Sequence, residues 1–67
     1  MSADMIDIEC EFQVETEDAI CIRPDPDDKK SDVWLPKSQI EWEGQAERGE
    51  DIIVAVPEWL AEQEGLI

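Results

Sequence analysis

The stretch IDIECEFQVE at residues 6–15 decides the fold of this chain. Apolar side chains occupy its even positions and polar side chains its odd positions, without interruption. A period of two is typical of a β-strand that has one buried face and one solvent-exposed face. We therefore predict one long strand with a row of acids along its exposed face. The acids of this row are Asp7, Glu9, Glu11 and Glu15.

Four further runs predict shorter strands, which cover residues 19–23, 32–35, 39–43 and 52–56. The first of them follows a turn at residues 16–18, and we expect it to form an antiparallel hairpin with the long strand. Stretches that contain proline or glycine separate the other runs and predict loops. The last run, IIVAV, is β-branched and apolar, as is typical of a central strand.

The C-terminal segment predicts one short helix. Pro57 suits the first helical position, Glu58 favours the positive end of the helix dipole, and Gly65 is typical of the position just after a helix. A helix of about two turns is not stable alone. We therefore expect Trp59 and Leu60 to dock it on the sheet.

Together these elements predict an α+β fold that is mainly β. We expect a small curled antiparallel sheet or partly closed barrel of about five short strands, with one short C-terminal helix. At 67 residues, we expect a single domain over residues 1–67. The predicted core comprises Ile6, Ile8, Phe12, Val14, Ile20, Ile22, Val33, Leu35, Ile40, Trp42, Ile52, Val54, Val56, Trp59 and Leu60.

Two residue types allow more than one interpretation. Cys10 and Cys21 fall in apolar runs, and we expect buried, reduced thiols, with a disulfide between them as the alternative. Trp34 alternates with Val33 and Leu35 and so points to the other face of its strand. It is either a half-exposed anchor at a partner surface or a residue packed under the C-terminal helix.

The composition excludes several classes of function. The chain has nineteen acidic and five basic residues, which gives a net charge of −14 at pH 7. Direct binding to nucleic acid or to an anionic membrane needs basic residues, so a basic protein surface is the expected partner. No apolar run approaches the ~20 residues of a membrane helix, and no basic segment marks a secretory signal, so a cytoplasmic location is expected. There is no histidine, and we expect no enzyme, no catalytic residue and no cofactor.

The acids themselves are the strongest functional feature. Residues 1–22 contain seven acids and no base. Neighbours on one strand face lie about 6.7 Å apart, whereas a DNA duplex carries one charge per ~1.7 Å, so a single row cannot mimic a duplex but two or three adjacent rows can. The acids beyond the first row that could join such a surface are Glu17, Asp18, Asp25, Asp27, Asp28, Glu41 and Glu43.

Two other interpretations of the acids stay open at this point. They can form an ordinary solvated sheet face that discourages edge aggregation, or they can be a global adaptation to high intracellular salt. A metal site is not expected, because the cluster at residues 25–28 lacks the ligand spacing of a calcium loop and two lysines follow it.

The segments VWLPKSQI (33–40), VPEWLAE (56–62) and GLI (65–67) resemble a group of very small phage and prophage proteins, over roughly residues 19–67. Small size and extreme acidity also resemble anti-CRISPR proteins of the DNA-mimic kind, which block DNA entry to a CRISPR surveillance complex by occupying its basic groove. This second resemblance rests on charge and size.

The first resemblance implies a phage origin, and the second implies a non-enzymatic inhibitor that acts in the host cytoplasm on a DNA-binding subunit of a CRISPR effector complex. We expect the chain to be a monomer. The alternative is an accessory module of phage replication or recombination that contacts proteins through Trp34 and the loop at residues 36–38. A structural piece of a larger particle is a third class.

Overall fold

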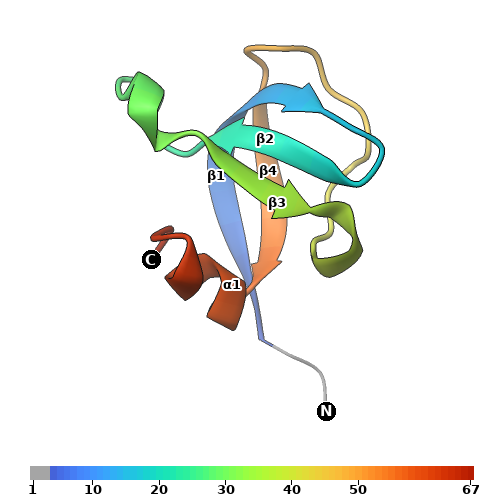
Figure 1. Ribbon diagram of the computed structural model, residues 1–67, viewed down its shortest axis with the longest axis vertical. Helices are drawn as coiled ribbons and strands as arrows, with labels where there is room; N and C mark the ends of the chain where they lie inside the picture. The colour runs from blue at the N-terminus through green and yellow to red at the C-terminus, as the bar shows by residue number, and fades with distance from the viewer. Residues whose placement is uncertain (1–3) are drawn as a thin grey trace.

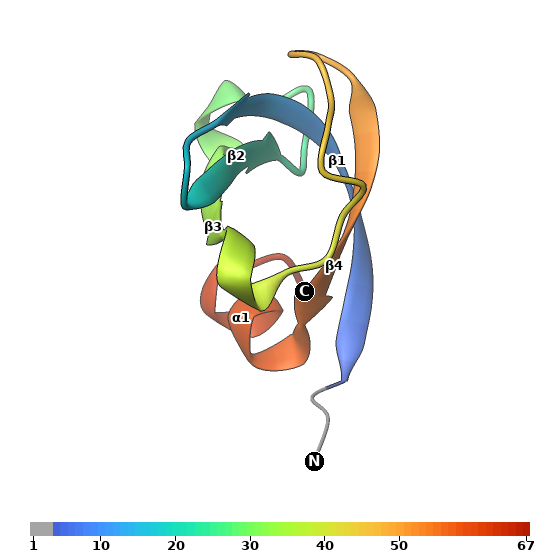
Figure 2. The same cartoon turned by 90° about the vertical axis from the view of Figure 1, so that its right-hand side faces the viewer.

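The computed structural model describes residues 4–67 and shows a mainly β protein (Figure 1). Its four strands form one antiparallel sheet in the order β3-β2-β1-β4, which curls into a half-barrel (Figure 2). The predicted curled sheet with one C-terminal helix is thus confirmed. The elements are β1 (Met5–Glu15), β2 (Ala19–Arg23), the 3-10 helix η1 (Lys29–Ser31), β3 (Val33–Pro36), the 3-10 helix η2 (Lys37–Gln39), β4 (Asp51–Pro57) and α1 (Glu58–Gln63).

The long strand β1 organises the sheet. Its N-terminal half pairs with β4, from Met5 to Glu11, and its C-terminal half pairs with β2, from Glu11 to Glu15. Glu11 is the one residue of β1 that has a partner on both sides, Arg23 in β2 and Asp51 in β4. The two halves of the sheet therefore meet at Glu11, where the strand passes from one neighbour to the other.

A β-bulge interrupts the alternation of β1. Phe12 pairs with Ile22 and Val14 with Cys21, so Gln13 is the extra residue between them. An extra residue in a strand moves each later side chain from the face that the alternation predicts to the opposite face. Gln13 is consequently buried and Val14 is 47% exposed, so the prediction that Val14 belongs to the core was wrong.

The predicted strand at residues 39–43 was also wrong. Residues 37–39 form η2, and only Glu41 is paired, in a single bridge with Ala55 made of two hydrogen bonds of 2.9 and 2.7 Å. The alternation within the segment is nevertheless real, because Ile40 is buried and Trp42 packs on the core. The 3-10 turn before it and Gly44 after it, with a φ of 88°, limit the extended stretch to a few residues.

The C-terminal helix begins at Glu58, with Pro57 as the residue that precedes it. Its end is closed by two backbone bonds, from the Leu66 amide to the Ala61 carbonyl (2.7 Å) and from the Gly65 amide to the Glu62 carbonyl (3.2 Å). This pattern needs a left-handed residue, and Gly65 has a φ of 74°.

The helix lies at one end of the sheet against β4 and β1 (Figure 1). Leu60 and Ala61 are its buried residues, and Leu60 confirms its predicted role. Trp59 is 49% exposed, so its predicted place in the core was wrong. A helix of six residues turns only one narrow face to the sheet, and Leu60 and Ala61 occupy it.

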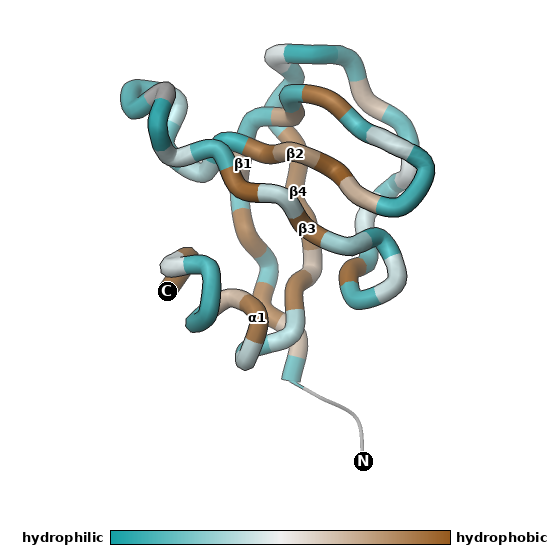
Figure 3. The backbone as a smooth tube through the Cα atoms, viewed as in Figure 1, coloured by the Kyte–Doolittle hydropathy of each residue, from teal (hydrophilic) through white to brown (hydrophobic). Residues whose placement is uncertain are grey.

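The core fills the inner side of the curled sheet, and the hydrophobic residues lie along the strands (Figure 3). Ile6, Val33 and Trp42 pack against this core but remain half-buried. Both cysteines are buried and free, as expected. The buried apolar residues are Ile8, Cys10, Phe12, Ile20, Cys21, Ile22, Leu35, Ile40, Ile52, Val54, Val56, Leu60 and Ala61.

Candidate functional site: an acidic face of the sheet

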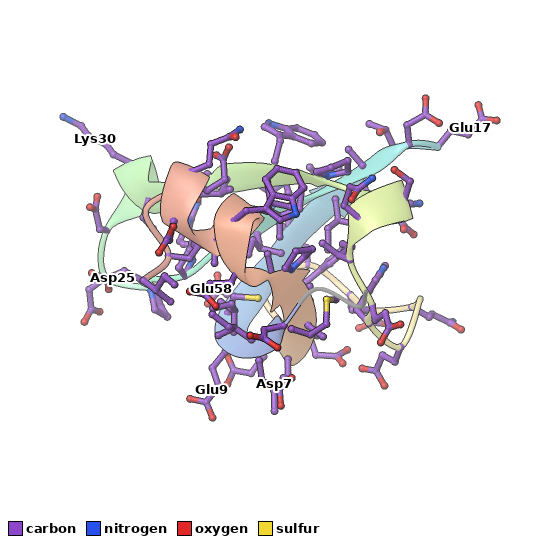
Figure 4. All side chains as sticks on the ribbon, turned by 90° about the horizontal axis from the view of Figure 1, so that it is seen from below. Asp7, Glu9, Glu17, Asp25, Lys30 and Glu58 are labelled. Atoms are coloured by element: carbon purple, nitrogen blue, oxygen red, sulfur yellow. The ribbon has the colours of Figure 1, made fainter. Side chains whose placement is uncertain are left out.

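The acids of the N-terminal half of β1 lie on the outer face of the sheet. Asp7 and Glu9 are exposed and Glu11 is half-buried, while the even-numbered residues between them face the core. Figure 4 shows the labelled Asp7 and Glu9 projecting from the same side of the molecule. This part of the predicted acidic row is confirmed.

The pairing with β4 extends this face sideways. Asp51 lies opposite Glu11, Ile53 opposite Glu9, and Ala55 opposite Asp7. Partners in a β-pair point to the same face of the sheet, so Asp51 adds a fourth carboxylate to the outer surface. Ile53 is 57% exposed and is the largest apolar side chain on β4 that points outward.

The segment after η2 adds a further acidic edge. Glu41 bridges Ala55 on the side of β4 away from β1, and its side chain is exposed. Glu43 lines the same open surface depression as Glu9, Asp51 and Ile53. We call the resulting surface the outer acidic face. It consists of Asp7, Glu9, Glu11, Glu41, Glu43 and Asp51.

The density of negative charge on the outer acidic face approaches that of a DNA duplex. From Asp7 to Glu11 the strand advances about 13 Å, and the outermost rows are two strand spacings, about 10 Å, apart. A duplex carries about eight phosphates over such a length. The six carboxylates of the face therefore supply roughly three-quarters of that charge. The sequence alone left open whether the rows lie side by side, and the strand order brings them together.

Glu11 differs from the other members of the face. Its Oε1 accepts a hydrogen bond from Gln13 Nε2 at 2.8 Å, and Arg23 Nη1 lies 3.9 Å away. Among the described residues, the other five acids of the face have no basic side chain within ion-pair distance. Their charge is therefore directed to solvent or to a partner, whereas Glu11 also stabilises the bulge.

The acids at the end of β1 do not continue the row. After the bulge, Glu15 pairs with Ile20, on the other face, and its Oε2 lies 2.9 Å from Lys37 Nζ. Glu17 and Asp18 occupy the exposed turn between β1 and β2. Figure 4 shows Glu17 on the opposite side of the molecule from Asp7 and Glu9. The expected extension of the acidic row around this turn is therefore wrong.

Two aspartates of the β2–β3 loop, Asp25 and Asp28, stabilise the loop itself. Asp25 Oδ1 accepts from the Asp27 amide at 3.0 Å, and Asp28 Oδ1 accepts from the Lys30 amide at 2.9 Å at the start of η1. Asp27 is exposed. Within residues 4–67 no cluster of His, Cys, Asp or Glu has the arrangement of a metal site.

One ion pair closes the base of this loop. Arg23 binds Asp32 with two hydrogen bonds, Nε to Oδ1 at 2.6 Å and Nη2 to Oδ2 at 3.2 Å. The hydrogen bond from Arg23 lowers the pKa of Asp32 and raises that of Arg23. The loop is thus anchored between β2 and β3, and its Pro24 and Pro26 line the same surface depression as Glu9, Glu43 and Asp51.

Trp34 lies on the outer face of β3 and is 51% exposed, which agrees with the anchor interpretation. It pairs with Cys21, which pairs with Val14, so these three residues form an apolar row across three strands. In the view of Figure 4, β3 lies on the side of the molecule away from Asp7 and Glu9. The Trp34 row and the outer acidic face are therefore two separate surfaces.

The thiols are not nucleophiles at neutral pH. Burial raises the pKa of Cys10 to about 11. Burial and, secondarily, the carboxylate of Asp32 raise the pKa of Cys21. Both thiols therefore stay protonated at neutral pH, and the Cys10 side chain belongs to the core cluster.

Comparison with known proteins gives no relative: no family model, no curated protein and no solved structure matches the chain. None of the helices in residues 4–67 has the length and apolar character that a bilayer crossing requires.

Proposed function

We propose that this chain is a phage-encoded, non-enzymatic inhibitor that mimics DNA and blocks the basic groove of a CRISPR surveillance complex in the host cytoplasm. The observation that carries the proposal is the outer acidic face. It presents six carboxylates in adjacent rows on one surface, with Arg23 beside Glu11 as the one base in ion-pair contact with it among the described residues. Its partner is a DNA-binding subunit whose lysines and arginines normally contact phosphate.

The mechanism is electrostatic. A solvated sheet face usually mixes charges of both signs, but a single-signed face costs folding stability through self-repulsion. A basic groove relieves that repulsion and gains ion pairs at the same time. Opposite potentials also steer the encounter, so association is fast at low ionic strength and slows as salt screens the field.

The experiment compares two double variants that change the net charge equally. Asp7→Lys with Glu9→Lys reverses the two exposed β1 carboxylates of the face, and both side chains lack side-chain hydrogen bonds in the described structure. Glu17→Lys with Glu62→Lys is the matched control on exposed positions outside the face, with Glu17 on the opposite side of the molecule (Figure 4). Tagged proteins capture effector complexes from a bacterial lysate at low and high salt.

We expect capture by the parent and by the control variant at low salt, reduced capture of both at high salt, and none by the Asp7/Glu9 variant. Equal capture by both variants would contradict the proposal, because the position of the charge would then be irrelevant. Capture by the parent that does not depend on salt would also contradict it.

A second candidate is an accessory module of phage replication or recombination that binds protein through Trp34 and the loop at residues 36–38. The exposure of the Trp34 indole supports it. The two functions use opposite sides of the molecule, so substitutions on one side distinguish between them. Under the second candidate, Trp34→Ala abolishes the interaction while the Asp7/Glu9 variant retains it.

A further inference from the structure

The N-terminal half of β1 has a neighbouring strand on only one side. It pairs with β4 from Met5 to Glu11, whereas β2 pairs with β1 only from Glu11 onward. Within residues 4–67, the β2 side of Met5–Cys10 therefore forms a free edge of the sheet, which we call the β1 edge. Figure 1 shows β4 on one side of this half of β1 and no strand on the other. An open strand edge offers its backbone groups to another chain.

The backbone groups of Asp7 and Glu9 point to this edge. Ala55 exchanges two hydrogen bonds with Glu41, on the side of β4 away from β1. Its partner Asp7 therefore belongs to a pair that is not hydrogen-bonded, and the amide and carbonyl of Asp7 point away from β4. The directions alternate along a strand, so Glu9 points the same way as Asp7. Within residues 4–67 these four groups have no hydrogen-bond partner.

The β2–β3 loop explains why the edge is free. If β2 continued past Arg23, which pairs with β1, Asp25 would lie opposite Glu9 and bond to it. The Asp25 backbone is instead used within the loop. Its amide donates to Ser31 Oγ at 3.4 Å, and its carbonyl accepts from the same hydroxyl at 3.2 Å. The backbone groups of Glu9 are therefore left for another chain.

The side chains beside these backbone groups select the chain that can be added. Asp7 and Glu9 are exposed on the outer face, two positions apart, and no described basic side chain lies within ion-pair distance of either. Residues that face each other across a strand pair are stabilised by opposite charges and destabilised by like charges. A second copy of β1 would place acid against acid. The β1 edge therefore favours basic residues at alternating positions and disfavours a copy of itself.

The residues that alternate with the acids define the rest of the pattern. Ile8 is buried on the inner side of the sheet, and Ile6 is half-buried against the core. An added strand sets its own alternate side chains beside them, where apolar residues fit. At the other end of the edge, Glu9 lines the open depression together with Pro24 and Pro26, which leaves room for the long stem of a basic side chain.

We infer that the β1 edge binds an extended segment of a partner protein by antiparallel β-strand addition, with basic residues opposite Asp7 and Glu9 and apolar residues between them. The four free backbone groups then exchange hydrogen bonds with the two basic residues. Backbone pairing holds the segment, and the carboxylates select its sequence. The inference goes beyond the proposed function, because DNA mimicry uses the carboxylates alone and needs no backbone pairing.

The test uses the intact protein and an acetylated, amidated peptide of the sequence Val-Arg-Val-Arg-Val. Amide hydrogen exchange followed by NMR reports each residue separately. The amides of Asp7 and Glu9 should exchange about tenfold more slowly, or less rapidly still, at saturating peptide, because they become hydrogen-bonded. The amide of Ile8 points to β4 and is already paired, so it is the internal control and should change little.

Two methylated peptides separate backbone pairing from charge. Each carries two N-methyl groups and the same net charge, with the methyl groups on both arginines in one peptide and on two valines in the other. In the antiparallel arrangement the arginine amides face β1 and the valine amides face away from it. Methylation of the arginines should therefore weaken binding about tenfold or more, and methylation of the valines should change it little.

A double variant tests the selection by charge. Asp7→Asn with Glu9→Gln keeps the backbone of the edge and removes both charges, so it should bind the unmethylated peptide more weakly and with a smaller dependence on salt. A circular dichroism spectrum like that of the parent verifies the fold. Binding as tight as that of the parent would overturn the charge selection.

Two results would overturn strand addition: equal binding of the two methylated peptides, or unchanged exchange of the Asp7 and Glu9 amides at saturating peptide. The peptide would then bind through charge alone. Neither result affects displacement of DNA by the outer acidic face, so failure of this inference is distinguishable from failure of the proposed function.

Discussion

Phe12 of β1 and Trp42 of the segment after η2 stack with their ring centroids 5.5 Å apart and an angle of 17° between the rings. The segment that carries Trp42 shares only one β-bridge with the sheet, at Glu41. The aromatic contact, the buried Ile40 and the bridge from Glu41 to Ala55 together hold Glu41 and Glu43 beside β4. Contacts in the interior of the molecule thus help to determine the shape of the outer acidic face.

Phe12→Ala should strongly destabilise the fold. Phe12 is buried and loses both its own packing and the stack with Trp42, so we expect a loss of about 3–5 kcal/mol. A domain of this size has about 5–15 kcal/mol or less, so the variant is expected to be barely folded at 25 °C. Urea unfolding monitored by tryptophan fluorescence measures the effect. An unfolding midpoint equal to that of the parent would show that Phe12 does not belong to the core.

The bulge predicts different effects for two substitutions of Glu11. Glu11→Gln keeps a carbonyl oxygen for the buried Gln13 amide and should change stability little. Glu11→Leu removes the acceptor and leaves that amide unpaired, at a cost of about 1–3 kcal/mol. Thermal unfolding of the two variants measures the difference, and equal melting temperatures would mean that the hydrogen bond from Gln13 to Glu11 contributes nothing.

The Arg23–Asp32 ion pair should make the stability of the fold depend on pH, with its contribution lost at low pH. The folded-state pKa of Asp32 lies below its unfolded value, because Arg23 donates hydrogen bonds to the carboxylate. The stability from this pair is therefore complete above the unfolded pKa, about 3.9, and is lost as the pH falls through the lower folded value.

Asp32→Asn isolates this contribution. The difference in unfolding free energy between parent and variant should be constant from about pH 5 to 8 and should shrink below about pH 4. Comparison with the variant is needed because protonation of the other acids also relieves repulsion in this range. A difference that grows as the pH falls would contradict the assignment.

The cysteines should be almost unreactive in the folded protein. With a pKa of about 11, roughly one Cys10 thiol in a thousand is ionised at pH 8, and the sulfur is also buried. Labelling of the native protein with a thiol reagent should be much slower than labelling in urea, where both cysteines react. Rapid reaction of the native protein would show that β1 or β2 opens easily.

The sequence predicts much of the fold but not the shape of the acidic surface. Strict alternation correctly predicts that Asp7, Glu9 and Glu11 lie on one face, because this part of β1 is regular and its apolar residues all face the core. The bulge at Gln13 leaves no trace in the sequence, since Gln13, Val14 and Glu15 continue the same alternation. The predicted faces of Val14 and Glu15 are therefore both wrong, for the same reason.

Residues that depend on long-range pairing could not be found from the sequence. Asp51 joins the outer acidic face only because β4 pairs with the N-terminal half of β1, and Ile53 is exposed for the same reason. Trp59 was expected in the core because so short a helix must be docked on the sheet, yet in this helix of six residues Leu60 and Ala61 take the buried positions. Strand order and helix rotation are properties of the packed molecule, and local patterns do not contain them.

The most direct test of DNA mimicry is a competition titration. Labelled duplex DNA is bound to a purified CRISPR surveillance complex, and its release is measured as the parent, the Asp7→Lys/Glu9→Lys variant or the Glu17→Lys/Glu62→Lys control is added. We predict that the parent and the control displace the DNA, whereas the Asp7/Glu9 variant needs a concentration about 100-fold higher or more, because two attractions become two repulsions. Displacement of the DNA by the folded Asp7/Glu9 variant at the same concentration as the parent would show that the outer acidic face is only a solvated surface.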